Sequence, residues 1–214
     1  MLTKKDLSSI QKQLSHYDEV REQVLTLSRN AIRLASGSIL EIHRGKLDVA
    51  DRNIQEIEKV LLKIQQVAED IPELATSQNV FVAYQEYTEA LTLKSFAETG
   101  KIPSLQDSGG FYRPYLLGLL DVVGEFRRMA LNSLRKGDVP KAEKLLDGME
   151  SIYDNLQVLE HTSIVPTFRA KMDASRRIIE ATRGDVVTEV RRFALEKALN
   201  RVEQRLSSSS AAKA

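Results

Sequence analysis

Apolar residues along the chain recur three and four positions apart, the spacing that places side chains on one face of an α-helix. The first stripe runs toward His43, where Gly45 offers a stop; it comprises Leu7, Ile10, Leu14, Val20, Val24, Leu27, Ala31 and Leu34. A second stripe, from Leu47, is expected to end at Ile71, because Pro72 restricts the residue before it and cannot continue the helical hydrogen bonding. No segment alternates with a period of two for long, so the pattern predicts an all-α fold.

The breaks between the stripes predict the organisation of the chain. Further helices are expected at about 74–98, 114–136, 140–160, 166–183 and 185–206. Gly184 is expected to separate the last two, and residues 207–214, "SSSSAAKA", to form a frayed tail. We therefore predict one domain over residues 1–206, a bundle of about seven helices.

Composition narrows the class of protein. With 10 glycines and 5 prolines in 214 residues, breakers are few enough to favour long helices. Cysteine is absent, which excludes disulfides and thiolate chemistry, and no signal-peptide core or membrane span is evident. A cytoplasmic protein without a membrane partner is expected. The net charge of +1 gives no indication of a nucleic-acid partner. Such a partner would need a local basic surface.

Four carboxylates lie in two segments that otherwise resemble buried helices. Glu86 and Glu89 are three residues apart, and Asp121 and Glu125 are four apart, so each pair shares one helix face. Helices joined by a loop of this length are commonly antiparallel neighbours, an arrangement that would bring the pairs together. Converging carboxylates repel unless they are protonated or bound to cations, and oxygen ligands suit Mg²⁺ or Mn²⁺. A metal site is one interpretation.

The other interpretation of these acids is structural. Acid pairs at helical spacing are usually a solvated face or part of a salt bridge, such as Glu125 with Arg128. A ferritin-like di-iron site is not expected, because the three histidines do not supply Glu-x-x-His repeats. Spacing alone leaves both interpretations open.

The motifs around these acids resemble the translin family, specifically its translin-associated factor X (TRAX) branch. They are "YQEYTEALTLKSF" and "PYLLGLLDVVGEFRRMALNSLRKGD", supported by "LSRNAIRLASGSILEIHRGK", "KAEKLLDGMESIYDNL" and "SIVPTFRAKMDASRRIIEATRGDV". The similarity spans about residues 20–186, and the compact chain is similar to microbial members. As a set the motifs are specific, although each alone would be weak.

The resemblance implies a seven-helix protein that assembles into a hollow octameric barrel and binds single-stranded or short duplex RNA, and also DNA. It further implies a Mg²⁺-dependent endoribonuclease, because Glu86, Glu89, Asp121 and Glu125 match the acidic positions of the active branch. We expect these residues to hold one or two Mg²⁺, with Mn²⁺ as a substitute, and a metal-bound water to attack the phosphodiester. A homo-oligomer, with the octamer as the expected size, follows from the similarity to microbial members.

Basic residues supply candidates for nucleic-acid binding. Arg29 and Arg33 are four apart on the first helix, His43 and Arg44 lie at its end, and Arg128 lies near Glu125. Ordinary salt bridges are an equal alternative for each.

Three hypotheses follow from the sequence. The first is the metal-dependent ribonuclease, the second is a nucleic-acid-binding oligomer without catalysis, and the third is a purely structural helical adaptor. The matched motifs favour the first.

Overall fold

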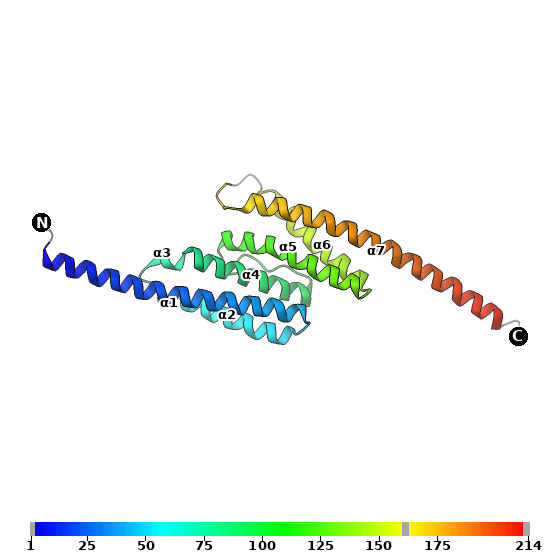
Figure 1. Cartoon of the computed structure of the whole chain (residues 1–214), viewed down its shortest axis with the longest axis horizontal. Helices are drawn as coiled ribbons and strands as arrows, with labels where there is room; N and C mark the ends of the chain where they lie inside the picture. The colour runs from blue at the N-terminus through cyan, green and yellow to red at the C-terminus, as the bar shows by residue number, and fades with distance from the viewer. Residues whose placement is uncertain (1–2, 160–162, 212–214) are drawn as a thin grey trace. The chain divides into compact units, whose positions relative to one another are not determined.

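The computed structural model describes residues 3–159 and 163–211, and within these residues every regular element is a helix (Figure 1). The predicted all-α fold is confirmed. The helices are α1 (Lys4–His43), α2 (Leu47–Val67), α3 (Pro72–Ala75), α4 (Gln78–Thr99), α5 (Tyr112–Arg135), α6 (Val139–Gln157) and α7 (Phe168–Ala211). Over the part of the chain described here, no helix combines the length and apolarity needed to cross a bilayer.

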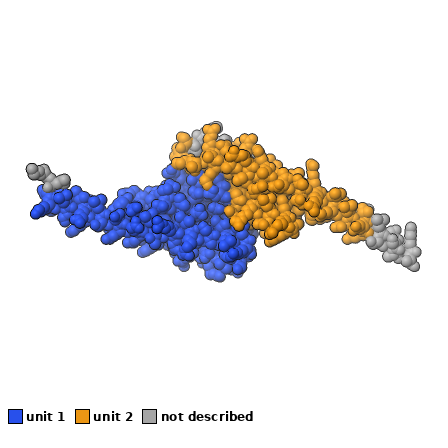
Figure 2. Space-filling model, viewed as in Figure 1, with its two compact units in different colours: residues 1–122 blue, residues 123–214 orange. Residues whose placement is uncertain are grey.

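The chain divides into two compact units, residues 1–122 and residues 123–214 (Figure 2). Unit 1 contains α1 to α4 and the beginning of α5. Unit 2 contains the rest of α5 together with α6 and α7.

The core of unit 1 is built on small residues of α1. The buried positions of this helix include Ser28, Ala31, Ala35 and Ser38, each with no exposed surface. Small side chains let neighbouring helices approach closely, and α2 and α4 supply the larger ones, among them Ile57, Ile64 and Val80. The long α1 is therefore the element against which the rest of unit 1 packs.

The second helix does not end at Ile71 as expected, and the position of Pro72 explains why. Helix α2 ends at Val67, and Pro72 begins the short α3 instead of merely ending α2. Proline suits the first turn of a helix, where its missing N–H would have no partner. Helix α4 consequently begins at Gln78, later than the expected 74.

The expected break at Gly184 is also wrong, because α7 is one helix from Phe168 to Ala211. Glycine inside a helix costs only about 1 kcal/mol relative to alanine. Contacts on both sides of it hold the helix in place: Arg183 donates to Glu150 of α6 at 2.7 Å, and Arg127 of α5 lies 3.3 Å from Asp185. The segment 207–214, expected as a tail, is helical as far as Ala211, and residues 212–214 lie outside the described part.

Candidate functional site

Helices α4 and α5 run in the same direction, which makes the expected antiparallel arrangement wrong. Contacts from successive parts of the chain show the direction: Arg113 lies over the Phe81 ring, and further along α5 Gly118 lies against Gln85 and Thr88. The connecting segment, residues 100–111, returns along α4 before α5 begins (Figure 1). The two helices are neighbours nonetheless.

The return of the connecting segment is fixed by two buried tyrosines of α4. The Tyr87 hydroxyl donates to Glu58 Oε1 at 2.9 Å and lies 3.4 Å from the carbonyl oxygen of Asp107. Gly109 packs on the Tyr84 ring with φ of +93°, and a Cβ there would lie 2.5 Å from Tyr84 Cε1. Burial raises the pKa of both phenols, with Glu58 adding to the effect at Tyr87. These tyrosines therefore serve the core and hold the segment that positions α5.

The closest approach of α4 and α5 lies at Gly118. A Cβ at this position would lie 2.7 Å from the carbonyl oxygen of Gln85 and 2.9 Å from Thr88 Cβ, which is closer than real Cβ contacts. Only glycine fits here without movement of one helix. The backbone of α5 thus lies directly against the acidic segment of α4.

A hydrogen bond joins the two helices next to this contact. Gln85 Nε2 donates to Asp121 Oδ2 at 2.7 Å, so the Asp121 carboxylate lies beside the turn of α4 that precedes Glu89. Sequence reasoning did not single out Gln85. The only signal was its place directly before Glu86 in the "QEYTEA" motif.

The carboxylates of α4 differ in exposure. Glu89 is buried, with 8% of its surface exposed, and Glu86 is half-buried. Glutamate is almost never fully buried unless it is paired, so its burial here sets Glu89 apart from an ordinary solvated acid. None of the four predicted acids lacks an interaction partner.

The fourth acid, Glu125, follows Asp121 by one turn of α5 and belongs to unit 2. Its carboxylate lies 3.7 Å from the Arg128 guanidinium, an ion pair whose arginine side chain is 57% exposed. Arg128 therefore forms the salt bridge that was the alternative to a phosphate contact.

Carboxylate oxygens are the ligands that Mg²⁺ prefers, so the donor chemistry of the four acids fits this ion. Their side-chain positions do not form a ready-made site. Within residues 3–159 and 163–211, no group of three or more His, Asp or Glu side chains is placed to hold a metal ion.

The predicted nucleic-acid-binding residues do not gather in one place. Arg29 and Arg33 lie on the exposed face of α1, and Arg33 donates to Asn30 at 2.8 Å. His43 follows Arg33 by ten residues, about 15 Å along the helix at 1.5 Å per residue. Arg44 forms an ion pair with Glu41 at 2.7 Å. The α1 candidates form two separate pairs along one helix.

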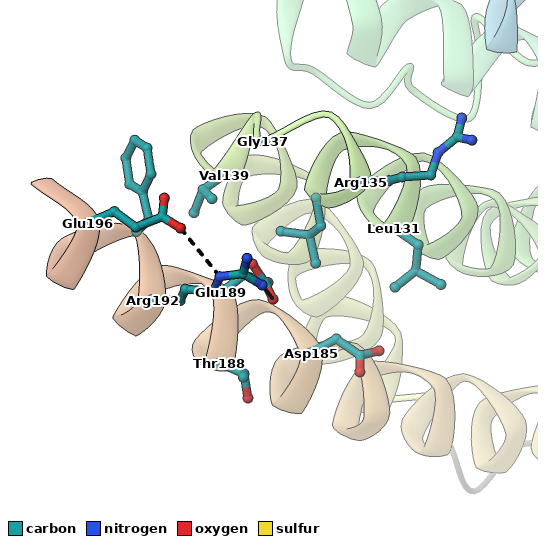
Figure 3. A pocket seen from close by; sticks show the side chains of 11 residues that line it. Leu131, Arg135, Gly137, Val139, Asp185, Thr188, Glu189, Arg192 and Glu196 are labelled. Atoms are coloured by element: carbon teal, nitrogen blue, oxygen red, sulfur yellow. Dashed lines mark ion pairs between the residues drawn. The ribbon is translucent and has the colours of Figure 1, made fainter.

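Unit 2 carries a pocket of about 610 Å³ that sequence reasoning missed (Figure 3). It lies between α7 and the end of α5 with the beginning of α6, and its lining includes Leu131, Arg135, Glu189, Arg192 and Glu196. Arg192 lies 3.7 Å from Glu189 and 3.4 Å from Glu196 on its own helix. The acids of this pocket are thus neutralised by arginine.

Comparisons with known proteins agree with the helical architecture. The Translin family profile matches residues 15–181. An uncharacterized protein of Methanocaldococcus jannaschii is 33% identical over 208 residues, covering 94% of this chain and 90% of the relative. Translin-associated protein X of Pongo abelii is 24% identical over 194 residues, covering 72% of this chain and 67% of its own.

Two solved structures superpose on most of the chain. Apo-NeC3PO superposes with a TM-score of 0.78 at 25% identity, covering 88% of this chain and 98% of that chain. AfC3PO in complex with duplex RNA superposes with a TM-score of 0.77 at 29% identity, covering 86% and 95% of the two chains.

Proposed function

The chain belongs to the translin family, and on that premise we propose that it is a homo-oligomeric, RNA-binding, Mg²⁺-dependent endoribonuclease. One observation carries the catalytic part of this proposal. The contact at Gly118 and the hydrogen bond from Gln85 to Asp121 place an acid of α5 beside the acidic segment of α4. An arrangement of this kind is expected of a shared carboxylate site and is unnecessary for a solvated helix face.

The residues proposed to hold the ion are Glu86, Glu89, Asp121 and Glu125. A step of four along α4 leads from Gln85 to Glu89, and the same step along α5 leads from Asp121 to Glu125. Glu89 and Glu125 therefore each lie, on their own helix, one turn beyond a residue of the Gln85–Asp121 hydrogen bond. Bound Mg²⁺ would supply a Lewis acid that lowers the pKa of water and neutralises charge on a phosphodiester.

Side chains around the four acids are proposed to orient a ligand carboxylate and to neutralise the charge of a bound phosphate. Gln85 donates its amide N–H to Asp121 Oδ2 and so fixes the orientation of this carboxylate. Arg128, next to Glu125, presents an exposed guanidinium that can pair with an RNA phosphate as well as with the carboxylate. Burial of Glu89 keeps its carboxylate out of bulk water, which strengthens its attraction for a cation.

For RNA binding, the support comes from the relative AfC3PO, which forms a complex with duplex RNA. We extend that property to this chain and assign phosphate contacts to Arg29, Arg33, His43, Arg44 and Arg128. Single-stranded RNA and single-stranded DNA are included as ligands, because phosphate contacts alone do not distinguish them. The proposed assembly is an octamer of one kind of subunit.

A second candidate is a nucleic-acid-binding oligomer without catalysis. The observation that favours it is that the acids, as placed in the described residues, do not form a group of three ligands. This candidate predicts RNA binding that survives EDTA and that weakens with salt in proportion to the number of phosphate contacts.

Cleavage of a labelled single-stranded RNA by the purified protein separates the two candidates. The reaction is run with Mg²⁺, with EDTA, and with a Glu89→Ala variant shown to be folded and equally oligomeric. Cleavage only with Mg²⁺ and intact Glu89 supports the ribonuclease. Intact RNA that still binds the protein supports the non-catalytic candidate.

A further inference from the structure

The apolar stripe of α1 continues beyond the core of unit 1. Steps of three and four residues connect its buried positions, Val20, Val24, Ser28, Ala31, Ala35, Ser38 and Ile42. Steps of three and four, counted backward from Val20, reach Tyr17, Leu14, Ile10 and Leu7. This is the heptad spacing of a helix that pairs with another helix. Within the described residues, the later half of the stripe is buried and the earlier half is exposed.

The earlier half is exposed along its whole length. Leu7, Ile10, Leu14 and Tyr17 are exposed by 53%, 45%, 65% and 37%. Figure 1 shows the first turns of α1 running past the ends of α2 and α4. We refer to residues 4–19 as the N-terminal arm.

The apolar stripe of the arm is narrow. The positions beside it are polar, among them Ser8, Ser9, Gln11 and Gln13. A stripe confined to two positions per heptad is typical of a coiled-coil seam, whereas a helix packed on a globular core carries a wider apolar face. One partner helix is therefore enough to cover it.

We propose that the N-terminal arm pairs antiparallel with the N-terminal arm of a second copy of this chain. In this alignment Leu7 meets Tyr17 of the second copy, and Ile10 meets its Leu14. The flanking charges then complement each other, because Lys4 of each copy lies beside Asp18 of the other. A parallel, in-register pair would instead place Asp6 beside Gln11 and Gln13 beside Asp18, with no opposite charges matched.

The pairing deepens the proposed homo-oligomer by naming one of its contact surfaces, and it is independent of the proposed nuclease activity. The arm is about 24 Å long at 1.5 Å per residue. An antiparallel pair of identical arms has two-fold symmetry, the commonest symmetry of homo-oligomers. Each copy then buries the apolar stripe of its arm against the arm of the other copy.

Disulfide cross-linking tests the pairing directly, because the chain contains no cysteine. Full-length Ile10→Cys and Leu14→Cys chains are co-expressed, oxidised and examined on a denaturing gel without reductant. The antiparallel pair predicts a covalent dimer in the co-expressed sample and little or none in either variant alone. A dimer from Leu14→Cys alone, or none in the co-expressed sample, overturns the proposal.

Two further samples sharpen the test. Leu62→Cys on α2, with 64% exposure, controls for random collision of exposed thiols. Co-expression of Leu14→Cys with Leu199→Cys, on the exposed part of α7, tests whether α7 of another copy covers the arm, and a dimer there contradicts arm-to-arm pairing.

Charge reversal tests the flanking ion pairs. Lys4→Glu in the cysteine chains is expected to lower cross-linking about threefold, and Lys4→Glu with Asp18→Lys to restore it, because two exposed ion pairs are lost and regained. Equal cross-linking in all three contradicts the antiparallel register. No RNA or metal is present in these experiments, so a failure here is distinct from a failure of the nuclease proposal.

Discussion

Asp121 and Glu89 in unit 1 lie in different surroundings from the acids that line the pocket of unit 2. In unit 1, Asp121 accepts a hydrogen bond from the neutral amide of Gln85, and Glu89 is buried. In unit 2, Asp185 lies beside Arg127, and Glu189 and Glu196 lie beside Arg192. A guanidinium neutralises an acid and competes with a cation for it, whereas an amide orients the acid and leaves its charge in place. The amide contact therefore suits Asp121 to a role in cation binding, whereas the pocket acids of unit 2 are already paired with arginine.

The largest expected effect comes from neutralising acids in the two units separately. Glu86→Gln or Asp121→Asn is expected to lower the rate of RNA cleavage about 100-fold or more, a size typical for loss of a group that stabilises developing charge. Glu196→Gln, in the pocket of unit 2, is the matched control and should leave the rate within about twofold. Equal losses for both kinds of variant would remove the distinction between the units.

Gln85 is predicted to act through Asp121. Gln85→Leu is expected to lower activity by about 10- to 100-fold, as is typical when an outer hydrogen bond to a metal ligand is lost. The Mg²⁺ concentration for half-maximal cleavage should rise as well, since the carboxylate is no longer oriented. Titration of the initial rate with Mg²⁺ checks both quantities, and an unchanged Mg²⁺ requirement would show that Gln85 serves packing alone.

Two glycines of α5 test the close approach of the helices. Gly118→Ala is expected to destabilise the protein by about 1–3 kcal/mol, because its Cβ would press on Gln85 and Thr88 of α4. Gly124→Ala, whose Cβ would meet nothing within 4 Å, is expected to stabilise by up to about 1 kcal/mol. Urea unfolding of the two variants measures the difference, and destabilisation of similar size in both would contradict the tight contact.

The smallest effect concerns the tyrosine that anchors the return segment. The pKa of Tyr87 in the folded protein is raised above its usual value of 10.0, so unfolding favours release of its proton at alkaline pH. Its contribution to stability is complete below about pH 10 and is lost as pH rises above that value. Tyr87→Phe should cost about 1 kcal/mol at neutral pH, through loss of the bond to Glu58, and should flatten the alkaline decline.

Thermal unfolding between pH 7 and pH 11 measures how steeply the stability declines with rising pH. Some decline should remain in the Tyr87→Phe variant, because burial also raises the pKa of Tyr84 and Tyr115. An alkaline slope identical to that of the unsubstituted protein would show that Tyr87 titrates normally.

Periodicity predicted the two helices that carry the four acids, but it did not predict the direction in which these helices pack. The three- and four-residue spacing of apolar positions placed α4 and α5 within a few residues. Their parallel direction depends on how residues 100–111 pack, and that packing involves Tyr84, Tyr87 and Gly109, residues far apart in the sequence. Such long-range contacts leave no periodic signal.

Local signals failed where tertiary contacts outweighed them. Gly184 reads as a helix breaker, yet the ion pairs of Arg183 and Asp185 hold α7 continuous across it. Pro72 reads as a stop, and it proves to be the start of α3. The acid pairs themselves were visible in the sequence, whereas the amide of Gln85 could be identified only once α4 and α5 were placed side by side.

Binding of Mn²⁺, followed by electron paramagnetic resonance in the absence of RNA, tests most directly whether the acids of α4 and α5 hold a cation. The protein is compared with Glu89→Ala and with Glu196→Gln, each verified to be folded. We expect Glu89→Ala to lose bound Mn²⁺ and Glu196→Gln to retain it. Equal Mn²⁺ binding by all three proteins, or none by the unsubstituted protein, would contradict a metal site between these helices.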